Sequence, residues 1–308
     1  FDNIAGGIQM YCEKILTKFF HNIHKATNCS NFVFSGGVAN NVKANKILAE
    51  QAFISNLWIP PGPGDESISI GAAYDFMYKK YGEKKTFNYI EIPQNAYWGP
   101  DINSKDISQF KNNKIVKRYF NHHEDKKFQK TAKALDNGEI VFVCFSRQEF
   151  GQRALGHRSI ICNPSNLESV KKINSTIKMR DFWMPFTPSI LDKDANKYVI
   201  INKKLNLNYM TVCLDSTDLG KKHLKAAMHP YDNTIRPQIV TKKNCSSYYE
   251  LINAFKKISG IGAVLNTSLN MHEYPIVNKP IDIINEIILK NKKPNFNVLI
   301  ENNFFQLK

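Results

Sequence analysis

The arginines of this chain are few and clustered, which makes them candidates for binding anions. The sequence holds 42 basic residues, yet only six are arginine, and five of these six lie between positions 147 and 236. A guanidinium grips two oxygens of a carboxylate or phosphate in a fixed geometry, whereas lysine supplies a mobile point charge. The stretch 150–160, FGQRALGHRSI, carries Arg153 and Arg158 in one loop. We expect this loop to bind phosphate or carboxylate groups.

Further polar residues lie where regular elements are expected to end. Lys178 and Arg180 close a predicted helix, Arg236 enters a predicted strand, and Ser268 and Asn270 leave another. Folds that mix helices and strands usually hold their ligands at such ends. One arginine there is more often part of a surface ion pair, but several together indicate a shared anionic ligand.

Two turns in the first half are candidate binding loops. Gly36 and Gly37 in SGGVANN follow a predicted strand and lead into a helix, whose free N–H groups suit a phosphate or ribose. The turn PPGPGDES presents Asp65 directly before another helix. Asp65 is a candidate for metal or substrate contact, but Asp65 or Ser67 capping that helix is an equal alternative.

Length and composition limit the class of protein. The 308 residues are 43% hydrophobic, enough for a sizeable core in one large or two ordinary domains. No run approaches the length of a membrane-spanning helix and no signal peptide opens the sequence, so we expect a soluble, cytoplasmic protein. The six cysteines form no C-x-x-C pair and are expected to be buried free thiols.

The net charge of +15 raises the question of nucleic-acid binding. The lysines are spread along the whole chain, without an arginine-rich tract or an aromatic platform. Nucleic acid is therefore not the expected partner. A small anionic substrate would benefit from the same positive field.

The order of predicted elements indicates two α/β or α+β units. In the first half we expect helix 3–26, strand 31–34, helix 40–52, a strand near 57–59 and helix 67–80, followed by a connector over about 82–125. In the second half we expect helices 126–137, 167–177, 246–258 and 280–289, and strands 140–145, 159–162, 186–191, 209–214, 235–241 and 263–266.

The first predicted helix carries an apolar stripe that needs a partner. Its apolar residues recur at spacings of three and four: Ile4, Ile8, Cys12, Ile15, Phe19 and Ile23. The chain also begins with Phe1 instead of methionine. We therefore expect it to be a piece of a longer or split protein.

Six motifs in this order closely resemble the NodU/CmcH O-carbamoyltransferase family over essentially the whole chain. They are GGVANN, PPGPGDESISIGAAY, EFGQRALGHRSI, KMRDFWMPFTPSI, HPYDNTIRPQ and NTSLNMHEYPIV. The resemblance implies an actin-like ATPase (Kae1-like) subdomain over 1–125 and a YrdC-like mixed α/β domain over 126–308. It also implies that carbamoyl phosphate and ATP give carbamoyl adenylate, whose carbamoyl group passes to a hydroxyl of a small acceptor at a metal-assisted site.

The resemblance also implies site residues and cofactors. Catalytic roles fall to Lys178, Arg180, Ser268 and Asn270; binding of carbamoyl phosphate and ATP falls to Arg153, Arg158, Arg236, Gly36, Gly37 and Asn40; and Asp65 is the metal ligand. The implied cofactors are ATP and a divalent metal, Fe²⁺ in the Kae1-like site and Mg²⁺ with ATP. The missing N-terminal segment is an implied partner, and a homodimer is compatible with the family.

The sequence departs from the family at several positions. Gln152 and His157 replace the commoner proline and asparagine, and Met184 stands where many members carry an arginine. The family's two metal-binding histidines belong to a segment that precedes this chain, and His21 and His24 do not match them. A tRNA-modifying threonylcarbamoyl-adenylate enzyme and a non-catalytic subunit of a split enzyme remain alternatives.

Overall fold

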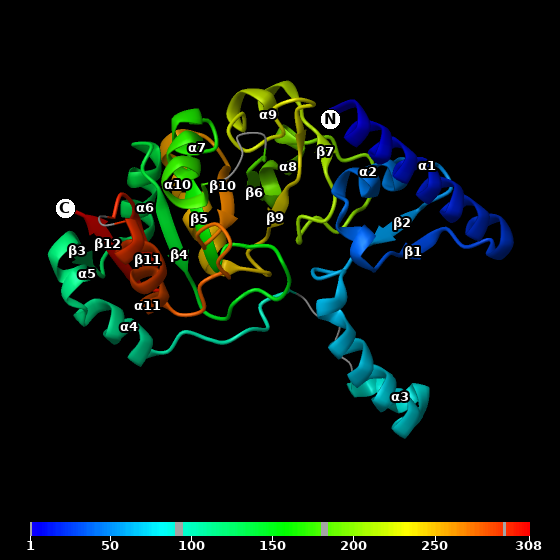
Figure 1. Cartoon of the computed structure of the whole chain (residues 1–308), viewed down its shortest axis with the longest axis horizontal. Coiled ribbons are helices and arrows are strands. Elements are labelled where there is room, and N and C mark those ends of the chain that lie inside the picture. The colour runs from blue at the N-terminus through cyan, green and yellow to red at the C-terminus, as the bar shows by residue number, and fades with distance from the viewer. Residues whose placement is uncertain (1, 90–94, 180–183, 292–293) are drawn as a thin grey trace. The chain divides into compact units, whose positions relative to one another are not determined.

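The chain packs as two compact units (Figure 1). This computed structural model describes residues 2–89, 95–179, 184–291 and 294–308. The first unit comprises Phe1–Ala96 and Ile201–Cys213, and the second comprises Tyr97–Ile200 and Leu214–Lys308. The segment 201–213 therefore belongs by packing to the unit that begins the chain. The family domains expected over 1–125 and 126–308 stay a prediction.

The first unit is built mostly of helices around one short parallel strand pair. Strands β1 (Asn31–Val33) and β2 (Asn56–Trp58) pair with Phe32 opposite Leu57. The helical elements are α1 (Asp2–Thr27), η1 (Gly37–Asn40), α2 (Val42–Glu50), η2 (Asp65–Ser67) and α3 (Ile68–Tyr89). The expected order of elements is confirmed. The expected helix 40–52 begins later because the Asn41 side chain accepts from Ala44 N and caps α2 at Val42.

The strand expected over 209–214 is wrong for most of its length. Residues 209–213 are buried but form no strand, and only Leu214 belongs to one. Their backbone bonds with α2 instead: Cys213 N donates to Val42 O, and Asn45 Nδ2 donates to Thr211 O. The apolar run reflects burial against α2 and not pairing in a sheet.

The second unit has a mixed α/β fold around an eight-stranded sheet of order β3-β12-β11-β4-β5-β10-β6-β9. Most neighbours are antiparallel, but β11 pairs with β4, and β6 with β9, in parallel. The strands are β3 (Phe120–His123), β4 (Val141–Cys144), β5 (Arg158–Cys162), β6 (Thr187–Leu191), β9 (Gln238–Val240), β10 (Ala263–Ser268), β11 (Asn297–Ile300) and β12 (Asn303–Leu307). A separate ribbon joins β7 (Leu214–Asp215) to β8 (Thr234–Ile235).

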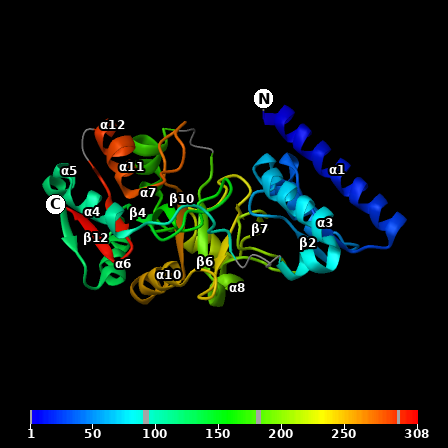
Figure 2. The same ribbon diagram turned by 90° about the horizontal axis from the view of Figure 1, so that it is seen from below.

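Helices cover both faces of this sheet (Figure 2). One face packs on a core shared with α4 (Ser104–Asn112), α5 (Lys114–Tyr119), α7 (Leu167–Ile173), η3 (Asn174–Lys178), α11 (Pro280–Asp282) and η5 (Ile283–Ile288), and α12 (Leu289–Asn291) continues η5. The other face packs on α6 (Lys127–Asp136) and α10 (Ser246–Ser259). Alternating strand residues supply the first core, among them Phe142, Ile160 and Leu265. The opposite face of β5 and β10 carries the polar residues Ser159, Asn266 and Ser268 beside the apolar Ile161 and Val264.

Several elements in this unit differ from the predictions. The expected connector contains α4, α5 and β3, and η4 (Asp192–Asp194), α8 (Ala195–Tyr198) and α9 (Asp218–His223) were not expected. The expected strand 235–241 is divided because Pro237 has no N–H to donate. The hairpin β11–β12 was missed because Glu301 occupies the positive-φ position (φ 49) that sequence rules reserve for glycine or asparagine.

The sequence predicts buried free cysteines and no membrane-spanning helix. All six cysteines are free thiols, and four of them are buried, but Cys29 is exposed and Cys12 is half-buried, so the expected burial is wrong for these two. Among the helices that the structure describes, none is both long and apolar enough to cross a membrane.

Candidate functional site

Three of the four predicted catalytic residues form one cluster. The Lys178 ammonium donates to Ser268 O at 2.5 Å, to Ser268 Oγ at 3.0 Å and to Asn270 Oδ1 at 2.6 Å. Ser268 Oγ also donates to Asn270 Oδ1 at 2.7 Å. Lys178 is only 5% exposed, so its charge lies in a largely desolvated, oxygen-lined setting. Such a fixed cation is suited to stabilising negative charge on a ligand.

The backbone explains how Lys178 reaches Ser268 across 90 positions of sequence. Lys178 ends η3, a π-helical continuation of α7, and Met179 follows in the left-handed region with φ 41. Single-turn π segments are frequent at functional sites because they re-aim a side chain. Ser268 is the last residue of β10, and Asn270 Nδ2 is held by Tyr274 O at 2.6 Å. Two rigid element ends thus fix the three side chains.

Residues 149–158, here called the arginine loop because they contain Arg153 and Arg158, connect β4 to β5. This loop is organised around Glu149. The Glu149 Oε1 atom accepts from Leu155 N at 2.7 Å, His157 N at 2.8 Å and Arg158 N at 3.1 Å. Glu149 is buried, with 7% of its surface exposed. Three backbone N–H groups converging on one oxygen fold residues 149–158 into a compact loop.

Side chains from the sheet hold the carbonyl groups of the same loop. Asn266 Nδ2 donates to Ala154 O at 3.0 Å, and Gln238 Nε2 donates to Leu155 O at 2.7 Å. The Tyr97 hydroxyl donates to the same Leu155 carbonyl at 2.8 Å. Both N–H groups and carbonyl groups of the loop backbone are therefore held by hydrogen bonds.

The loop and the Lys178 cluster belong to one end of strands β5 and β10. Ser159 lies opposite Ser268 in the antiparallel register, and Ser159 Oγ accepts from Gly156 N at 3.0 Å. Leu269 N donates to Arg158 O at 3.0 Å, which joins the residue after β10 to the residue that begins β5. The expected grouping of these polar residues at strand ends thus has a geometric basis.

Gly156 has no room for a side chain. Its φ is +106, and a Cβ atom there would lie 2.2 Å from Cδ1 of Tyr248.

His157 stacks on Tyr97 with 3.6 Å between ring centroids, and burial lowers the pKa of its imidazole. The departure from asparagine at position 157 therefore adds a neutral ring to the packing beneath the loop.

The two arginines of the loop have different environments. Arg158 is fully buried and donates to four carbonyl oxygens, those of Phe145, Ser146, His157 and Asn278. Arg153 is half-buried, and its guanidinium has no hydrogen-bond or ion-pair partner among the described residues. Burial lowers the pKa of Arg153. This geometry makes Arg153 the better candidate for anion contact and gives Arg158 a supporting role in the loop.

The remaining predicted arginines are less defined. Arg236 is half-buried between β8 and β9. Arg180 lies outside the described residues, two positions after Lys178. Their predicted roles as anion ligands stay predictions.

The first unit brings its two predicted turns together. Gly36 N donates to Pro63 O at 2.7 Å, and Ser35 Oγ donates to the same carbonyl at 3.0 Å. Gly36 has φ +105, a conformation that favours glycine, and no atom lies within 4 Å of a Cβ built on Gly36 or Gly37. The glycine turn therefore has open space on its outer side, next to the half-buried Asn40.

Asp65 does not by itself form a metal site. It begins η2 as an exposed residue, and no side chain caps that short element. Capping of the following helix α3 by Asp65 or Ser67 stays an alternative. Among the described residues, no group of three or more His, Cys, Asp or Glu side chains is placed to hold a metal ion. A single exposed carboxylate retains a divalent ion poorly. The residues present do not fit the implied metal, and we derive no chemical step from it.

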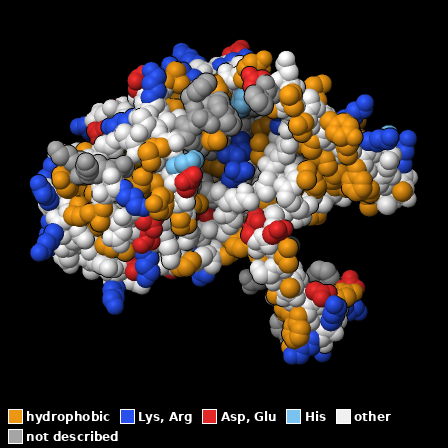
Figure 3. Space-filling model, viewed as in Figure 1, with side chains coloured by type: hydrophobic (Ala, Val, Ile, Leu, Met, Phe, Trp, Pro, Cys, Tyr) orange, Lys and Arg blue, Asp and Glu red, His pale blue; other side chains and the backbone are white. Residues whose placement is uncertain are grey.

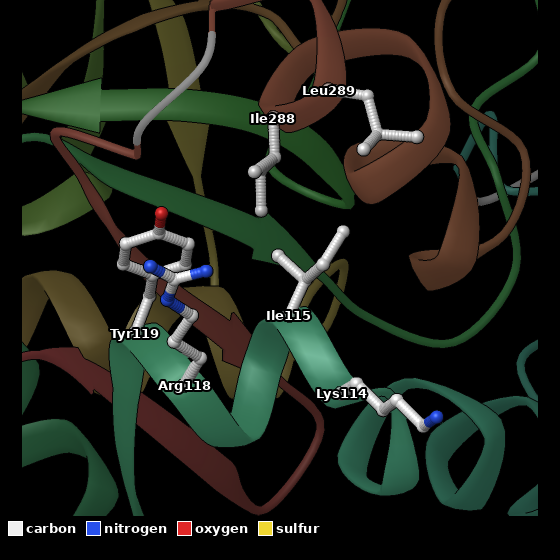
Figure 4. A pocket seen from close by; sticks show the side chains of 6 residues that line it. All are labelled: Lys114, Ile115, Arg118, Tyr119, Ile288 and Leu289. Carbon is white, nitrogen blue, oxygen red and sulfur yellow. The ribbon is translucent and has the colours of Figure 1, made fainter.

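A small hollow lies elsewhere in the second unit (Figure 4). It has a cavity volume of about 290 Å³ and is lined by Lys114, Ile115, Arg118 and Tyr119 of α5 and by Ile288 and Leu289. The Arg118 guanidinium lies over the Tyr119 ring at 5.3 Å from its centroid. This hollow shares no residue with the Lys178 cluster or the arginine loop.

Comparison with known proteins decides the family. Residues 132–306 match the profile described as Carbamoyltransferase C-terminus, and residues 1–74 match that of Carbamoyltransferase N-terminus. The chain belongs to the carbamoyltransferase family. The predicted family is therefore confirmed. Glu149, Asn266 and Gln238 lie inside the motifs that carry this resemblance, but no separate sequence signal pointed to their roles.

Curated relatives match this chain over most of its length. Nodulation protein NolO of Bradyrhizobium diazoefficiens is 29% identical over 283 residues, which cover 92% of this chain and 51% of the relative. Nodulation protein U of Sinorhizobium fredii is 24% identical, covering 88% and 46%. An uncharacterized protein of Methanocaldococcus jannaschii is 33% identical, covering 96% and 54%. The chain spans about half the length of these relatives.

Two solved structures share a distant similarity with the carbamoyltransferase chain. Full-length HypF in its phosphate- and nucleotide-bound form is 19% identical over 58% of this chain and 25% of that chain, with a TM-score of 0.41. YciO of E. coli is 14% identical over 68% and 84%, with a TM-score of 0.39. Both similarities are too distant to assign a function.

Proposed function

We propose that this chain is part of an O-carbamoyltransferase that uses ATP to activate carbamoyl phosphate and passes the carbamoyl group to a hydroxyl of a natural product or sugar. The YrdC-like domain, residues 126–308, would carry out activation. Residues 1–125 would be a subdomain of the Kae1-like transfer domain. The observation that carries the proposal is the cluster of buried Lys178 with half-buried Ser268 and Asn270, at the strand end that also holds the loop with Arg153.

The proposed activation takes place in two steps, in each of which every bond broken and formed is accounted for. Water cleaves carbamoyl phosphate to carbamate and inorganic phosphate. A carbamate oxygen then attacks the α-phosphorus of ATP, and pyrophosphate leaves with the electrons of the broken P–O bond. Each turnover thus gives one carbamoyl adenylate, one phosphate and one pyrophosphate. All reactants are anions, so catalysis depends on fixed cations and hydrogen-bond donors.

The described residues can supply a fixed positive charge and hydrogen-bond donors for this reaction. Lys178 supplies a desolvated positive charge, and Ser268 and Asn270 hold its ammonium in place. The Arg153 guanidinium has no partner among the described residues, so its N–H groups can donate to phosphate oxygens. Arg180 and Arg236 would complete the anion site, as the family resemblance implies.

The transfer step requires more than the described residues supply. The glycine turn with Asn40 would hold nucleotide in the Kae1-like part, because its backbone is open to a close ligand approach. Fe²⁺ at the transfer site and Mg²⁺ with ATP are implied by the family, but Asp65 alone does not hold either ion. We therefore assign the acceptor site to the complete enzyme.

The exposed apolar face of α1 supports a partner segment. Ile4, Ile8 and Phe19 are 64%, 66% and 58% exposed, and hydrophobic side chains follow the length of this helix (Figure 3). A monomer seldom exposes so continuous an apolar stripe. We propose that the other part of the N-terminal carbamoyltransferase domain covers it. A homodimer is the alternative occupant.

One assay separates the proposed function from its rivals. The purified chain is incubated with ATP and either carbamoyl phosphate or threonine with bicarbonate, and pyrophosphate release is measured. We expect release with carbamoyl phosphate alone. Release only with threonine and bicarbonate would indicate the tRNA-modifying type, and release with neither would indicate a non-catalytic subunit.

A further inference from the structure

Glu149 is a buried acid that the proposed chemistry does not use. Its Oε1 atom accepts three backbone N–H groups of the arginine loop. Its Oε2 atom is buried and has no hydrogen-bond partner among the described residues. Burying a carboxylate is costly, and a second oxygen without a partner adds to that cost. A neutral side chain would suffice if the position served packing alone.

The bonds of Glu149 bracket Arg153 in the sequence. The acid lies four residues before Arg153, and its three donors lie two, four and five residues after it. Drawing these N–H groups to one oxygen closes the loop, and residues 150–153 form its bend. Asn266 fixes Ala154 O directly beside the arginine. The guanidinium thus projects from a backbone that is held on both sides.

We propose that Glu149 is a positioning residue of the reaction, which sets the loop so that the Arg153 guanidinium is presented to a phosphate group of the substrate. The inference takes its substrate from the proposed function, but it concerns the hydrogen bonds between Glu149 and the loop backbone. Glu149 itself touches no substrate. Its effect on anion binding passes through Arg153.

The test is a double-mutant cycle that needs no turnover. Binding of inorganic phosphate is titrated by NMR or calorimetry for the wild-type chain, Glu149→Gln, Arg153→Met and the double variant. Glutamine keeps the shape and one oxygen but weakens the bonds to the three N–H groups. We expect Glu149→Gln to weaken phosphate binding by about tenfold, and to cause no further loss when Arg153 is already methionine.

Two controls distinguish positioning from general destabilisation. Glu139→Gln changes a half-buried acid that bonds Asn297 at 2.6 Å outside the loop, and it should leave phosphate binding unchanged. Tyr97→Phe removes only the hydroxyl bonded to Leu155 O. It should fold even if Glu149→Gln does not, and its smaller loss of affinity should also vanish in the Arg153→Met background.

The outcomes are separable from those of the proposed function. An equal loss with and without Arg153, or no measurable phosphate binding by the wild-type chain, would overturn the role of Glu149. A wild-type chain that binds phosphate through Arg153 but does not consume carbamoyl phosphate would leave that role intact. It would count only against the proposed reaction.

Discussion

At the scale of single residues, the Lys178 ammonium lies among three oxygen acceptors that Ser268 and Asn270 supply. Lys178, Ser268 and Asn270 are far apart in sequence, yet the structure joins them by bonds of 2.5–3.0 Å. Arg158 was expected to bind anions, whereas its guanidinium is occupied by main-chain carbonyls. A residue's type gives its chemistry, but only its burial and neighbours decide whether that chemistry faces a ligand.

Substitution of Ser268 tests whether the cluster serves catalysis. Ser268→Ala removes one oxygen from the Lys178 ammonium, and hydrogen bonds to charged groups are worth about 1.5–3 kcal/mol. We expect pyrophosphate release to fall about tenfold to a hundredfold with little change in melting temperature. Ser175→Ala is the matched control, because that exposed hydroxyl bonds only a helix carbonyl. A large drop in melting temperature with unchanged turnover would identify Ser268 as part of a structural turn.

At the scale of elements, long periodic segments were predictable and short pieces were not. Helices α1, α6 and α10 and strands β4, β5 and β10 lie close to their expected positions, because hydrophobic periodicity and buried runs determine them. The hairpin β11–β12 turns through a positive φ at a glutamate, and the π-helical η3 ends at Lys178, whose bonds to Ser268 and Asn270 span some 90 positions of sequence. Neither feature leaves a pattern in the local sequence.

Asp194 links two elements by ion pairs and should make stability depend on pH. Its carboxylate is buried and pairs with Lys197 at 2.8 Å and with Lys256 of α10 at 2.6 Å. Burial alone would raise the pKa of Asp194, but the two lysines hold it below its ordinary value of 3.8. The pairs therefore stabilise the fold above that value, and this contribution disappears as the pH falls through the lower, folded pKa.

We predict that Asp194→Asn lowers the free energy of unfolding at neutral pH by about 1–2 kcal/mol, since both lysines are partly exposed. Urea unfolding at neutral pH and at about pH 3 checks this, and the difference from wild type should shrink at the lower pH. Asp218→Asn, at an exposed pair with Lys221, should change little at either pH. A difference that grows on acidification would contradict the assignment.

At the scale of the whole molecule, the family is established and the division of labour between the units is a proposal. The chain matches both carbamoyltransferase profiles but spans about half the length of its relatives. The acceptor could not be predicted from the sequence, because none of its motifs specifies an acceptor, and the described residues contain no group of three or more side chains placed to hold a metal ion. The exposed stripe of α1 was predictable, since helical spacing alone places its residues on one side.

The apolar stripe predicts that transfer needs a second polypeptide segment. Adding the remaining N-terminal segment of a relative's carbamoyltransferase domain in trans should bury α1 and enable carbamoylation of a polyol acceptor. Ile8→Glu should abolish this gain without affecting pyrophosphate release, because a charge on the stripe opposes association. Stable O-carbamoyl product from the chain alone would contradict the need for a partner.

The central claim is that the Lys178 cluster activates carbamoyl phosphate, and following the labelled carbamoyl group tests it most directly. The chain is mixed with ATP and ¹⁴C-carbamoyl phosphate, rapidly quenched, and analysed for label in the adenylate. Lys178→Met retains the length of the side chain but removes the charge that Ser268 and Asn270 surround. We expect labelled carbamoyl adenylate from the wild-type chain and at least about a hundredfold less from a folded Lys178→Met variant. Equal labelling in both proteins, or phosphate and pyrophosphate release without any labelled adenylate, would contradict the central claim.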